Sequence, residues 1–422
     1  MEEWKEYKLG DVCRMIPGFA FKSNEFGTGS NLAIKIKDIQ PPYVETKNAD
    51  NVDITRYGLE KLSKFIVHKG EFLLAMTGAT IGKIGKYIDE EPAYINQRVL
   101  KFQDTGFISY EYLYYYLSTD IFQSFILNHI DSQSAQPNIS SNTIGKYPIK
   151  VPSLNTQQKI ASILKSLDDK IEVNRRINDN LEQQAQALFK SWFVDFEPFK
   201  DGEFVESELG MIPKGWRVAK IKDIPHTLNT GKRPKGGAIT SGVPSIGAEQ
   251  LKGLCNYDYT KTKYISKDYS QSIPKGKVIG YEVYLNRVGG KPGNYIQNTT
   301  MFGEGYPYEN CYINDHVFKL DFMQNRGYNV YIFFTFLTSR IQKYLNACGG
   351  KAAIPVINKQ NIDDIYIFLP ENECVKKFGE SVLPMINMIF KIGIESARLA
   401  TLRDTLLPRL MSGELSVNDI KG

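Results

Sequence analysis

The longest hydrophobic pattern in the chain begins after Pro152 and repeats every 3.5 residues, the period of a coiled-coil seam. Its positions are spaced alternately four and three residues apart, and eight of ten are apolar: Ile160, Leu164, Leu167, Ile171, Asn174, Asn178, Leu181, Ala185, Leu188 and Trp192. A second series lies 218 residues further on, again with eight apolar members of ten: Phe378, Val382, Met385, Ile389, Ile392, Ser396, Leu399, Arg403, Leu406 and Leu410. Each series predicts a helix of roughly 35 to 40 residues, about 50–60 Å long.

Polar residues in the middle of these seams indicate how the helices pair. Asn174, Asn178 and Ser396 stand in the middle, where buried polar groups cost stability but fix register and partner. We expect the two helices to pack on each other as an antiparallel coiled coil; the alternative is two amphipathic helices, each lying on its own domain. Because proline lacks an N–H donor, we also expect a kink or late start near Pro384 and a stop before Pro408.

The rest of the sequence contains an internal repeat, with one copy in each half of the chain. Residues 94–101 (YINQRVLK) resemble residues 312–319 (YINDHVFK) at the same offset of 218, and an offset of 212 matches Trp4 with Trp216 near the start of each half. Short strand-like runs (31–36, 72–76, 99–102, 278–284) mix with helical patterns (109–128, 329–347). The sequence therefore predicts an α+β fold: two globular mixed α/β domains in tandem repeat, separated by the paired helices. The expected parts are a first domain (1–152), a long helix (153–197), a linker (198–215), a second domain (216–370), a second long helix (371–415) and a tail (416–422).

Composition excludes several classes of protein. With 422 residues and 42% hydrophobic side chains, the chain can bury real cores, so wholesale disorder is excluded. No run of about 18 apolar residues predicts a membrane span, and the acidic, polar start does not read as a signal peptide. The five cysteines are scattered and odd in number, which indicates free thiols in a reducing cytosol. We therefore expect a cytoplasmic protein.

A search for catalytic chemistry finds only incomplete motifs. Residues 78–84 resemble a phosphate-binding loop, but the loop is one residue short and no Ser or Thr follows Lys83. Residues 40–43 (QPPY) resemble an amino-methyltransferase tetrapeptide, but Gln40 replaces the Asn or Asp that would hold the amine. The four histidines form no HxH or HxxxH pair, so no metal site is predicted. The sequence predicts neither catalytic residues nor a metal or cofactor bound by this chain.

Basic, glycine-containing loops do recur in both halves. Glycine lets the backbone approach phosphates, Lys and Arg neutralise them, and amide side chains can reach base edges. The candidate DNA-binding residues are Lys22, Ser23, Thr77, Lys83, Lys86, Gln133, Gln136 and Asn138 in the first half, and Lys232, Arg233, Lys235, Arg287, Lys291, Asn358 and Lys359 in the second. The net charge of +5 is uneven: residues 206–370 carry +8, whereas 1–152 carry −1, 153–205 carry −2 and 371–422 carry none. We therefore expect the second half to contribute more of the electrostatic attraction to DNA.

The helical segments resemble the specificity subunits of type I restriction–modification systems. Residues 157–171 and 188–198 (LFKSWFVDFEP) look like the central conserved region of that family, and residues 406–415 (LLPRLMSGEL) look like its distal conserved region. Residues 213–216 (PKGW) resemble the opening of a second target recognition domain, and residues 16–23 resemble an early loop of a first one. The resemblance covers essentially the whole chain.

This resemblance implies a non-catalytic subunit that recognises DNA. Each recognition domain would read one half of a bipartite double-stranded target. The helices would space the domains and dock two methylation subunits, which an ATP-driven restriction subunit can join. S-adenosylmethionine and ATP with Mg²⁺ would bind these partners rather than this chain. The residues predicted to pair the helices and dock partners are Ile160, Leu164, Leu167, Ile171, Leu181, Leu188, Trp192, Ile389, Ile392, Leu399 and Leu406.

One sequence feature of the family is present in the second half of the chain but not in the first. The family's loop motif usually carries a basic residue just before the glycine turn, and Arg287 matches that position in the second half. The first half has Met76-Thr77 there instead, so the resemblance assigns no equivalent phosphate contact to this loop. Two other classes remain open at this stage: a stand-alone DNA methyltransferase or nuclease with diverged motifs, and a coiled-coil scaffold that binds proteins.

Overall fold

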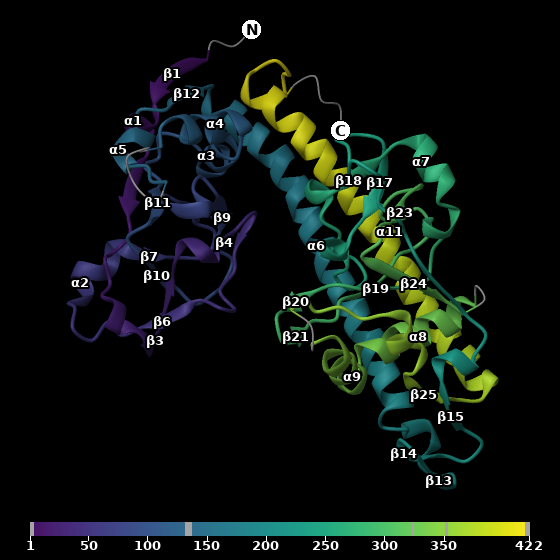
Figure 1. The fold of residues 1–422 in the computed structure, drawn as a ribbon. Helices are drawn as coiled ribbons and strands as arrows, with labels where there is room; N and C mark the ends of the chain where they lie inside the picture. The colour runs from purple at the N-terminus through teal and green to yellow at the C-terminus, as the bar shows by residue number, and fades with distance from the viewer. Residues whose placement is uncertain (1–3, 131–136, 323–324, 351–352, 418–422) are drawn as a thin grey trace. The chain divides into compact units, whose positions relative to one another are not determined.

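The computed structural model describes residues 4–130, 137–322, 325–350 and 353–417, and it divides the chain into two compact units (Figure 1). The first unit consists of Met1–Asp169 and Ala400–Gly422, and the second of Lys170–Leu399. The two long helices, α6 (Leu154–Phe193) and α11 (Asn372–Met411), each contribute to both units.

The first unit is built on a six-stranded sheet, β2-β11-β8-β9-β5-β4, and a four-stranded sheet, β6-β3-β10-β7, while β1 pairs with β12. Its elements are β1 (Lys5–Lys8), α1 (Leu9–Val12), β2 (Arg14–Pro17), β3 (Phe26–Ile34), β4 (Ile39–Gln40), β5 (Tyr43–Val44), β6 (Asp50–Val52), α2 (Leu59–Leu62), β7 (Ile66–Val67), β8 (Phe72–Ala75), β9 (Ile84–Lys86), β10 (Ala93–Ile95), β11 (Val99–Gln103), α3 (Tyr110–Leu117), α4 (Asp120–Asn128), α5 (Ser141–Ile144) and β12 (Pro148–Val151).

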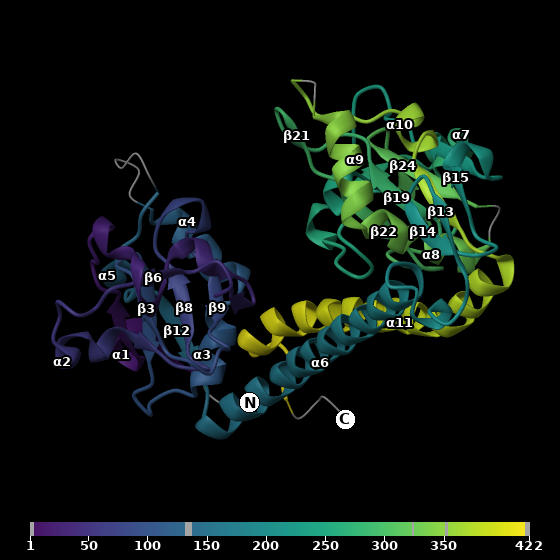
Figure 2. The same ribbon diagram turned by 90° about the horizontal axis from the view of Figure 1, so that it is seen from below.

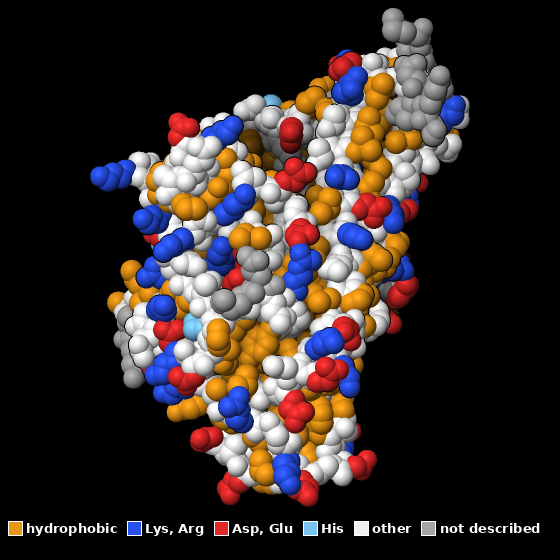
Figure 3. All heavy atoms as spheres, turned by 90° about the vertical axis from the view of Figure 1, so that its right-hand side faces the viewer, with side chains coloured by type: hydrophobic (Ala, Val, Ile, Leu, Met, Phe, Trp, Pro, Cys, Tyr) orange, Lys and Arg blue, Asp and Glu red, His pale blue; other side chains and the backbone are white. Residues whose placement is uncertain are grey.

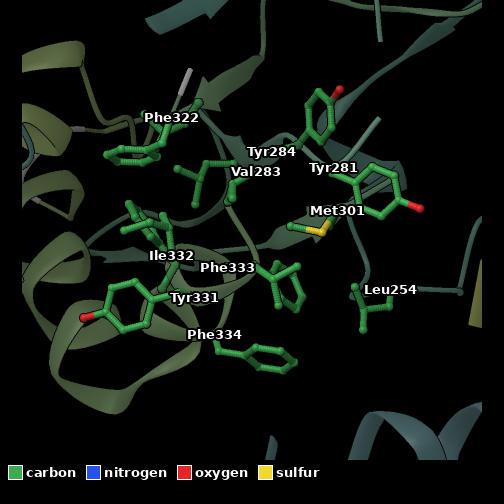
Figure 4. Packing of buried hydrophobic residues seen from close by; sticks show 14 of the residues in the cluster. Leu254, Tyr281, Val283, Tyr284, Met301, Phe322, Tyr331, Ile332, Phe333 and Phe334 are labelled. Atoms are coloured by element: carbon green, nitrogen blue, oxygen red, sulfur yellow. The ribbon is translucent and has the colours of Figure 1, made fainter. Parts of the chain in front are cut away.

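The second unit has a four-stranded sheet, β16-β24-β19-β22, and a three-stranded sheet, β18-β17-β23; β15 pairs with β25, β13 with β14 and β20 with β21. Its elements are β13 (Phe204–Ser207), β14 (Gly210–Pro213), β15 (Arg217–Lys220), β16 (Thr227–Thr230), β17 (Val243–Ile246), β18 (Lys263–Ile265), α7 (Lys267–Ser272), β19 (Val283–Asn286), β20 (Gly290–Lys291), β21 (Asn294–Tyr295), β22 (Thr299–Met301), β23 (Tyr312–Ile313), β24 (Val317–Asp321), α8 (Arg326–Leu337), α9 (Ser339–Gly349), α10 (Lys359–Asp363) and β25 (Tyr366–Leu369). Its core includes aromatic side chains from the sheet and from α8, among them Tyr284, Tyr331 and Phe333 (Figure 4).

Strand registers confirm that the two halves share one fold. β1 pairs with β12 in the register Lys5↔Val151, and β15 pairs with β25 in the register Arg217↔Leu369, which reproduces the sequence offsets of 212 and 218. The parallel pairs agree as well: Ile95 of β10 lies opposite Ile34, and Ile313 of β23 lies opposite Ile246. The predicted mixed α/β tandem repeat is therefore correct down to individual residue pairs.

A buried lysine occupies the same place in each unit. Lys101 lies 3.4 Å from Glu71 and its counterpart Lys319 lies 3.4 Å from Glu282, and each ammonium also donates to a backbone carbonyl. The lysine side chains are 8% and 7% exposed. Since a buried charge is tolerated only when it is paired and hydrogen-bonded, these lysines belong to the interior and are unavailable to an external anion.

The long helices pair in antiparallel orientation, as the seam predicts. Within the second unit, Asn174 Nδ2 donates to Ser396 Oγ at 3.2 Å, Asn178 Nδ2 donates to the Ile389 carbonyl at 3.3 Å, and Phe189 packs on Phe378. Numbers rise along α6 while they fall along α11, and the two helices lie side by side in Figure 2. The buried polar residues therefore contact one another, or the facing backbone, where they define the register.

The eleven seam residues predicted to pair the helices are buried or half-buried within the chain itself. Ile160 and Leu164, for example, join the core of the first unit, and Ile389 joins that of the second. Docking of a partner by these same side chains stays a prediction, because their surfaces are largely covered by this chain.

The prolines of α11 do not mark its ends. The helix begins at Asn372 and ends at Met411, so the late start near Pro384 and the stop before Pro408 are wrong, whereas the alternative of a kink near Pro384 stays a prediction. Each proline removes one intrahelical hydrogen bond, at a cost of about 3 kcal/mol in a helix interior. Val382, Ile386 and Leu410 are fully buried around these positions, and their packing outweighs the local penalty.

Four predicted elements differ from the observed ones. The strand expected at 278–284 is wrong except at its end, because Glu282 accepts the N–H groups of Ile279 and Gly280 and forms a turn before β19. The predicted helices at 109–128 and 329–347 are each divided in two, the first where Thr119 caps α4. Residues 198–215, expected as a linker, contain the β13–β14 hairpin, with Ile212 buried in the second unit.

Candidate nucleic-acid interface

Four chain segments meet at one place in each unit, and we call them together the platform. They are an early loop, the residues that follow the central strand β8 or β19, a tight turn before β11 or β24, and a loop before α5 or α10. In the first unit the segments are 18–20, 76–78, 96–98 and 137–139; in the second they are 231–233, 287–289, 314–316 and 355–357.

The same backbone hydrogen bonds hold both platforms. Met76 N–H donates to the carbonyl of Arg98 at 2.9 Å, and Arg287 N–H donates to that of His316 at 2.7 Å. Gly78 N–H donates to Pro137, and Gly289 N–H donates to Pro355. The bridge between residues 77 and 138 likewise corresponds to that between 288 and 356. The backbone contacts among the strand end, the turn and the last loop are therefore repeated in both units, whatever side chains these segments carry.

Glycine is required where the early loop crosses the turn. A Cβ on Gly18 would lie 2.2 Å from the Asn96 carbonyl oxygen, and one on Gly231 would lie 1.7 Å from the Ile313 carbonyl oxygen. Both distances are far inside van der Waals contact, so no side chain fits at either position. The two glycines let the early loop lie directly against the turn.

In the second unit the platform carries a charged cluster. Arg233 Nε lies 3.4 Å from the Asp315 carboxylate, and Arg233 Nη2 lies 3.4 Å from His316 Nε2. Arg287 Nη1 donates to the Asp315 carbonyl at 2.9 Å, and its guanidinium lies over the Phe318 ring at 5.3 Å. The structure thus brings together two of the predicted DNA-binding residues, Arg233 and Arg287.

In the first unit the same backbone positions carry different side chains. Thr77 is buried and donates to the Pro137 carbonyl at 2.8 Å, and Met76 belongs to the core. Arg98, at the position of His316, is exposed and its Nη1 lies 3.4 Å from Asn138 Oδ1. Sequence reasoning proposed Thr77 and Asn138 but missed Arg98. The 218-residue offset was the available signal, because it aligns Arg98 with His316.

The other predicted basic residues have varied surroundings. Lys86 is half-buried, forms an ion pair with Glu111 at 2.6 Å and lies over the Tyr114 ring at 4.1 Å. Lys83 is half-buried, and Asn358 caps α10 by accepting from Asn361 N–H. Exposed positions are held by Lys22, Ser23, Lys232, Lys235, Lys291 and Lys359, whereas Gln133 and Gln136 lie outside the described residues.

A pocket of about 350 Å³ lies within the first unit, and Lys83 is part of its lining. Asp168 on α6 accepts from Arg403 Nη1 of α11 at 2.8 Å and from the Tyr115 hydroxyl at 2.7 Å. Burial, together with the Asp168 carboxylate, raises the pKa of Tyr115 above its ordinary value, which keeps this hydroxyl a donor. Lys83 therefore faces the helix-bearing side of its unit and is not one of the platform residues.

Positive and negative charges are mixed on one face of the molecule. In the face shown in Figure 3, Lys and Arg side chains are spread among Asp and Glu side chains rather than gathered in one patch. Asp364 illustrates this, since it lies 3.2 Å from both Lys220 and Lys222. The Asp364 carboxylate accepts hydrogen bonds from the side chains of Gln360, Lys220 and Lys222, and these bonds lower the pKa of Asp364 to about 2. On this face an anionic partner would therefore meet mixed charges rather than one basic patch.

Two absences concern the described part of the chain. It contains no group of three or more His, Cys, Asp or Glu side chains arranged to hold a metal ion. None of its helices combines the length and the apolar character that a membrane crossing requires. All five cysteines are free, as expected, and burial raises the pKa of Cys13 and Cys311 to about 12.

Known proteins share this arrangement. Residues 1–183 match the family described as Type I restriction modification DNA specificity domain. The chain is 28% identical to the type I restriction enzyme MjaIX specificity subunit of Methanocaldococcus jannaschii, over 99% of this chain and 98% of that one. It is 25% identical to the HindI specificity subunit of Haemophilus influenzae, over 98% and 100%. The type I S subunit from M. genitalium has a similar fold, with a TM-score of 0.57 at 14% identity, over 97% and 96%.

A duplicated α/β unit with two long paired helices is thus the architecture of the type I specificity subunits. Residues 1–183 match the model of their DNA specificity domain, and the chain is similar to two of these subunits along nearly its whole length. The resemblance that the helix motifs indicated is confirmed.

Proposed function

We propose that this chain is the non-catalytic DNA-recognition subunit of a type I restriction–modification complex, with each unit contacting one half of a bipartite target. The observation that carries the proposal is the repeated platform, which presents exposed cations in both units on corresponding backbone segments. Arginine side chains next to glycine turns suit contacts with phosphates and base edges. The relatedness to proteins named as specificity subunits supports the same function.

Methylation would reside in partner subunits, which hold S-adenosylmethionine. The alternative, a stand-alone methyltransferase or nuclease, is tested by incubating the purified chain with duplex DNA and labelled S-adenosylmethionine. We expect no transfer by the chain alone and transfer to adenine once the methylation subunits are added. Methyl transfer by the lone chain would overturn the proposal.

The long helices would space the two recognition units and dock the methylation subunits. Because the seam is covered, docking needs other residues, and α6 offers the large apolar side chains of Val173 and Ile177, which are 49% and 40% exposed. Residues four apart lie on one helix face, so the two form a short apolar strip. Exposed apolar strips on otherwise polar helices are typical of partner surfaces.

Docking can be tested without disturbing the core. Ile177→Asp should weaken co-purification of the methylation subunits with this chain, because it replaces one of the two apolar side chains of the strip with a charged one. Gln183→Asp, also exposed on α6, is the matched control. Leu181→Asp would be a poorer test, since Leu181 packs against the core of the second unit. Normal assembly with Ile177→Asp would exclude this strip as the docking face.

A further inference from the structure

We infer that Arg98 is the DNA-phosphate contact of the first unit and replaces there the cations that Arg233 and Arg287 supply in the second. The inference rests on the proposed function and names residues within it. Its starting point is the platform, where the two units have the same backbone and different side chains.

The backbone correspondence places Arg98 unambiguously. The carbonyl of Arg98 accepts from Met76 N–H, just as the carbonyl of His316 accepts from Arg287 N–H. The next residues, Val99 and Val317, begin the equivalent strands β11 and β24. The side chains of Arg98 and His316 are therefore attached at equivalent backbone positions of the two platforms.

The charged positions are exchanged between the units. The second unit has Arg233 and Arg287, where the first has Ala20 and the buried Met76. Conversely, the first unit has Arg98 where the second has His316. Each platform thus keeps a guanidinium on the same small surface, although it is attached to a different segment.

Position 98 is also adjacent to position 20. In the second unit, the residues at the equivalent positions touch, since Arg233 Nη2 lies 3.4 Å from His316 Nε2. A guanidinium at position 20 would therefore occupy nearly the same volume as that of Arg98. Because the two positions are adjacent, the exchange can be tested by removing the guanidinium at position 98 and introducing one at position 20.

The surroundings of Arg98 suit an external anion. The side chain is exposed, its Nη1 lies 3.4 Å from Asn138 Oδ1, and within the described ranges no carboxylate forms an ion pair with it. Lys86, by contrast, is paired with Glu111, and Lys101 is buried with Glu71. Arg98 is thus the platform cation of the first unit whose charge remains available, among the residues that the structure describes.

The test measures binding of the purified full chain to duplex DNA of mixed sequence as a function of salt. Because one phosphate contact contributes about 0.9 to the slope of log K against log salt, Arg98→Ala should lower that slope by about one. The same relation gives a loss of affinity of about eightfold at 0.1 M salt. Arg56→Ala, an exposed arginine of the same unit outside the platform, should leave both values unchanged.

A rescue variant separates a phosphate contact from a structural role. Ala20 is exposed, so Ala20→Arg in the Arg98→Ala background should fold and restore the slope, whereas Ala20→Gln in the same background should not restore it.

Arg233→Ala tests the second platform independently. If the wild type does not bind DNA, the proposed function fails. If Arg233→Ala lowers the slope but Arg98→Ala behaves like Arg56→Ala, only the inference about Arg98 fails. A loss confined to target DNA with an unchanged slope would also overturn the phosphate assignment.

Discussion

The ion pair between Asp168 and Arg403 should stabilise the end of α11 against the first unit by far more than a surface pair would. The two side chains are only 22% and 24% exposed, their closest atoms are 2.8 Å apart, and the Tyr115 hydroxyl bonds to the other carboxylate oxygen. We test this with Asp168→Asn, Arg403→Met and the double variant, which together isolate the interaction from the effect of each side chain alone.

The expected magnitude follows from geometry. Two unit charges at this separation attract by about 6 kcal/mol at an effective dielectric constant of about 20. Removing the charges from water offsets most of that energy, and a charge-assisted hydrogen bond retains about 1.5–3 kcal/mol. We therefore expect a coupling free energy of about 2 kcal/mol.

Native-state hydrogen exchange of residues 154–169 and 400–411 measures the coupling, because opening of these segments reports on the tie between the helices and the first unit. The matched control is the pair Lys165–Asp169 on the same helix, which is 46% and 61% exposed. Exposed pairs four residues apart typically contribute about 0.3–0.5 kcal/mol. A coupling for Asp168–Arg403 no larger than that of the control pair would refute the reasoning from burial.

Three further perturbations test the fold and the platform. Gly231→Ala should disrupt the second platform and lower DNA affinity, since the added Cβ would lie 1.7 Å from a carbonyl oxygen, whereas Gly58→Ala, in open space, should be neutral; filter binding checks both. Leu164→Ala should lower the free energy of unfolding by about 2–5 kcal/mol in urea titrations, because the side chain is fully buried; an effect below about 1 kcal/mol would contradict its place in the core. The pKa of Asp364 is lowered to about 2, so its stabilising contribution is complete above its ordinary pKa near 4 and is lost as pH falls towards 2. Thermal unfolding of Asp364→Asn should therefore approach that of the wild type as pH falls through this window, and a constant difference would contradict the assigned pKa.

The repeat and the helix pairing could be predicted because both are written in long, regular patterns. An offset of 218 joins many residue pairs, and a seam of ten positions averages over local exceptions. Asn174 and Ser396 could even be recognised as polar seam residues, and they contact each other. Periodicity of this length is stronger evidence than any single residue provides.

Local exceptions were harder to predict, because they depend on contacts distant in sequence. Pro408 was expected to end a helix, yet packing around it keeps α11 helical to Met411. The ion pair of Lys86 with Glu111 of α3 could not be predicted either, because the two residues are 25 positions apart, and a DNA contact by Lys86 stays a prediction. Arg98 was overlooked because it lies in a turn without glycine, although the repeat itself aligns it with His316.

The way the platform is built has a consequence for how such a protein can evolve. Its shape is maintained by main-chain hydrogen bonds and by two glycines, none of which depends on the side chains at positions 20 and 98 or at 233 and 316. Substitutions at these positions should therefore cost little folding stability. Charged and amide side chains can replace one another there during evolution while the backbone of the platform stays the same. Two copies in one chain can also diverge separately, so that a new preference acquired by one leaves the other intact.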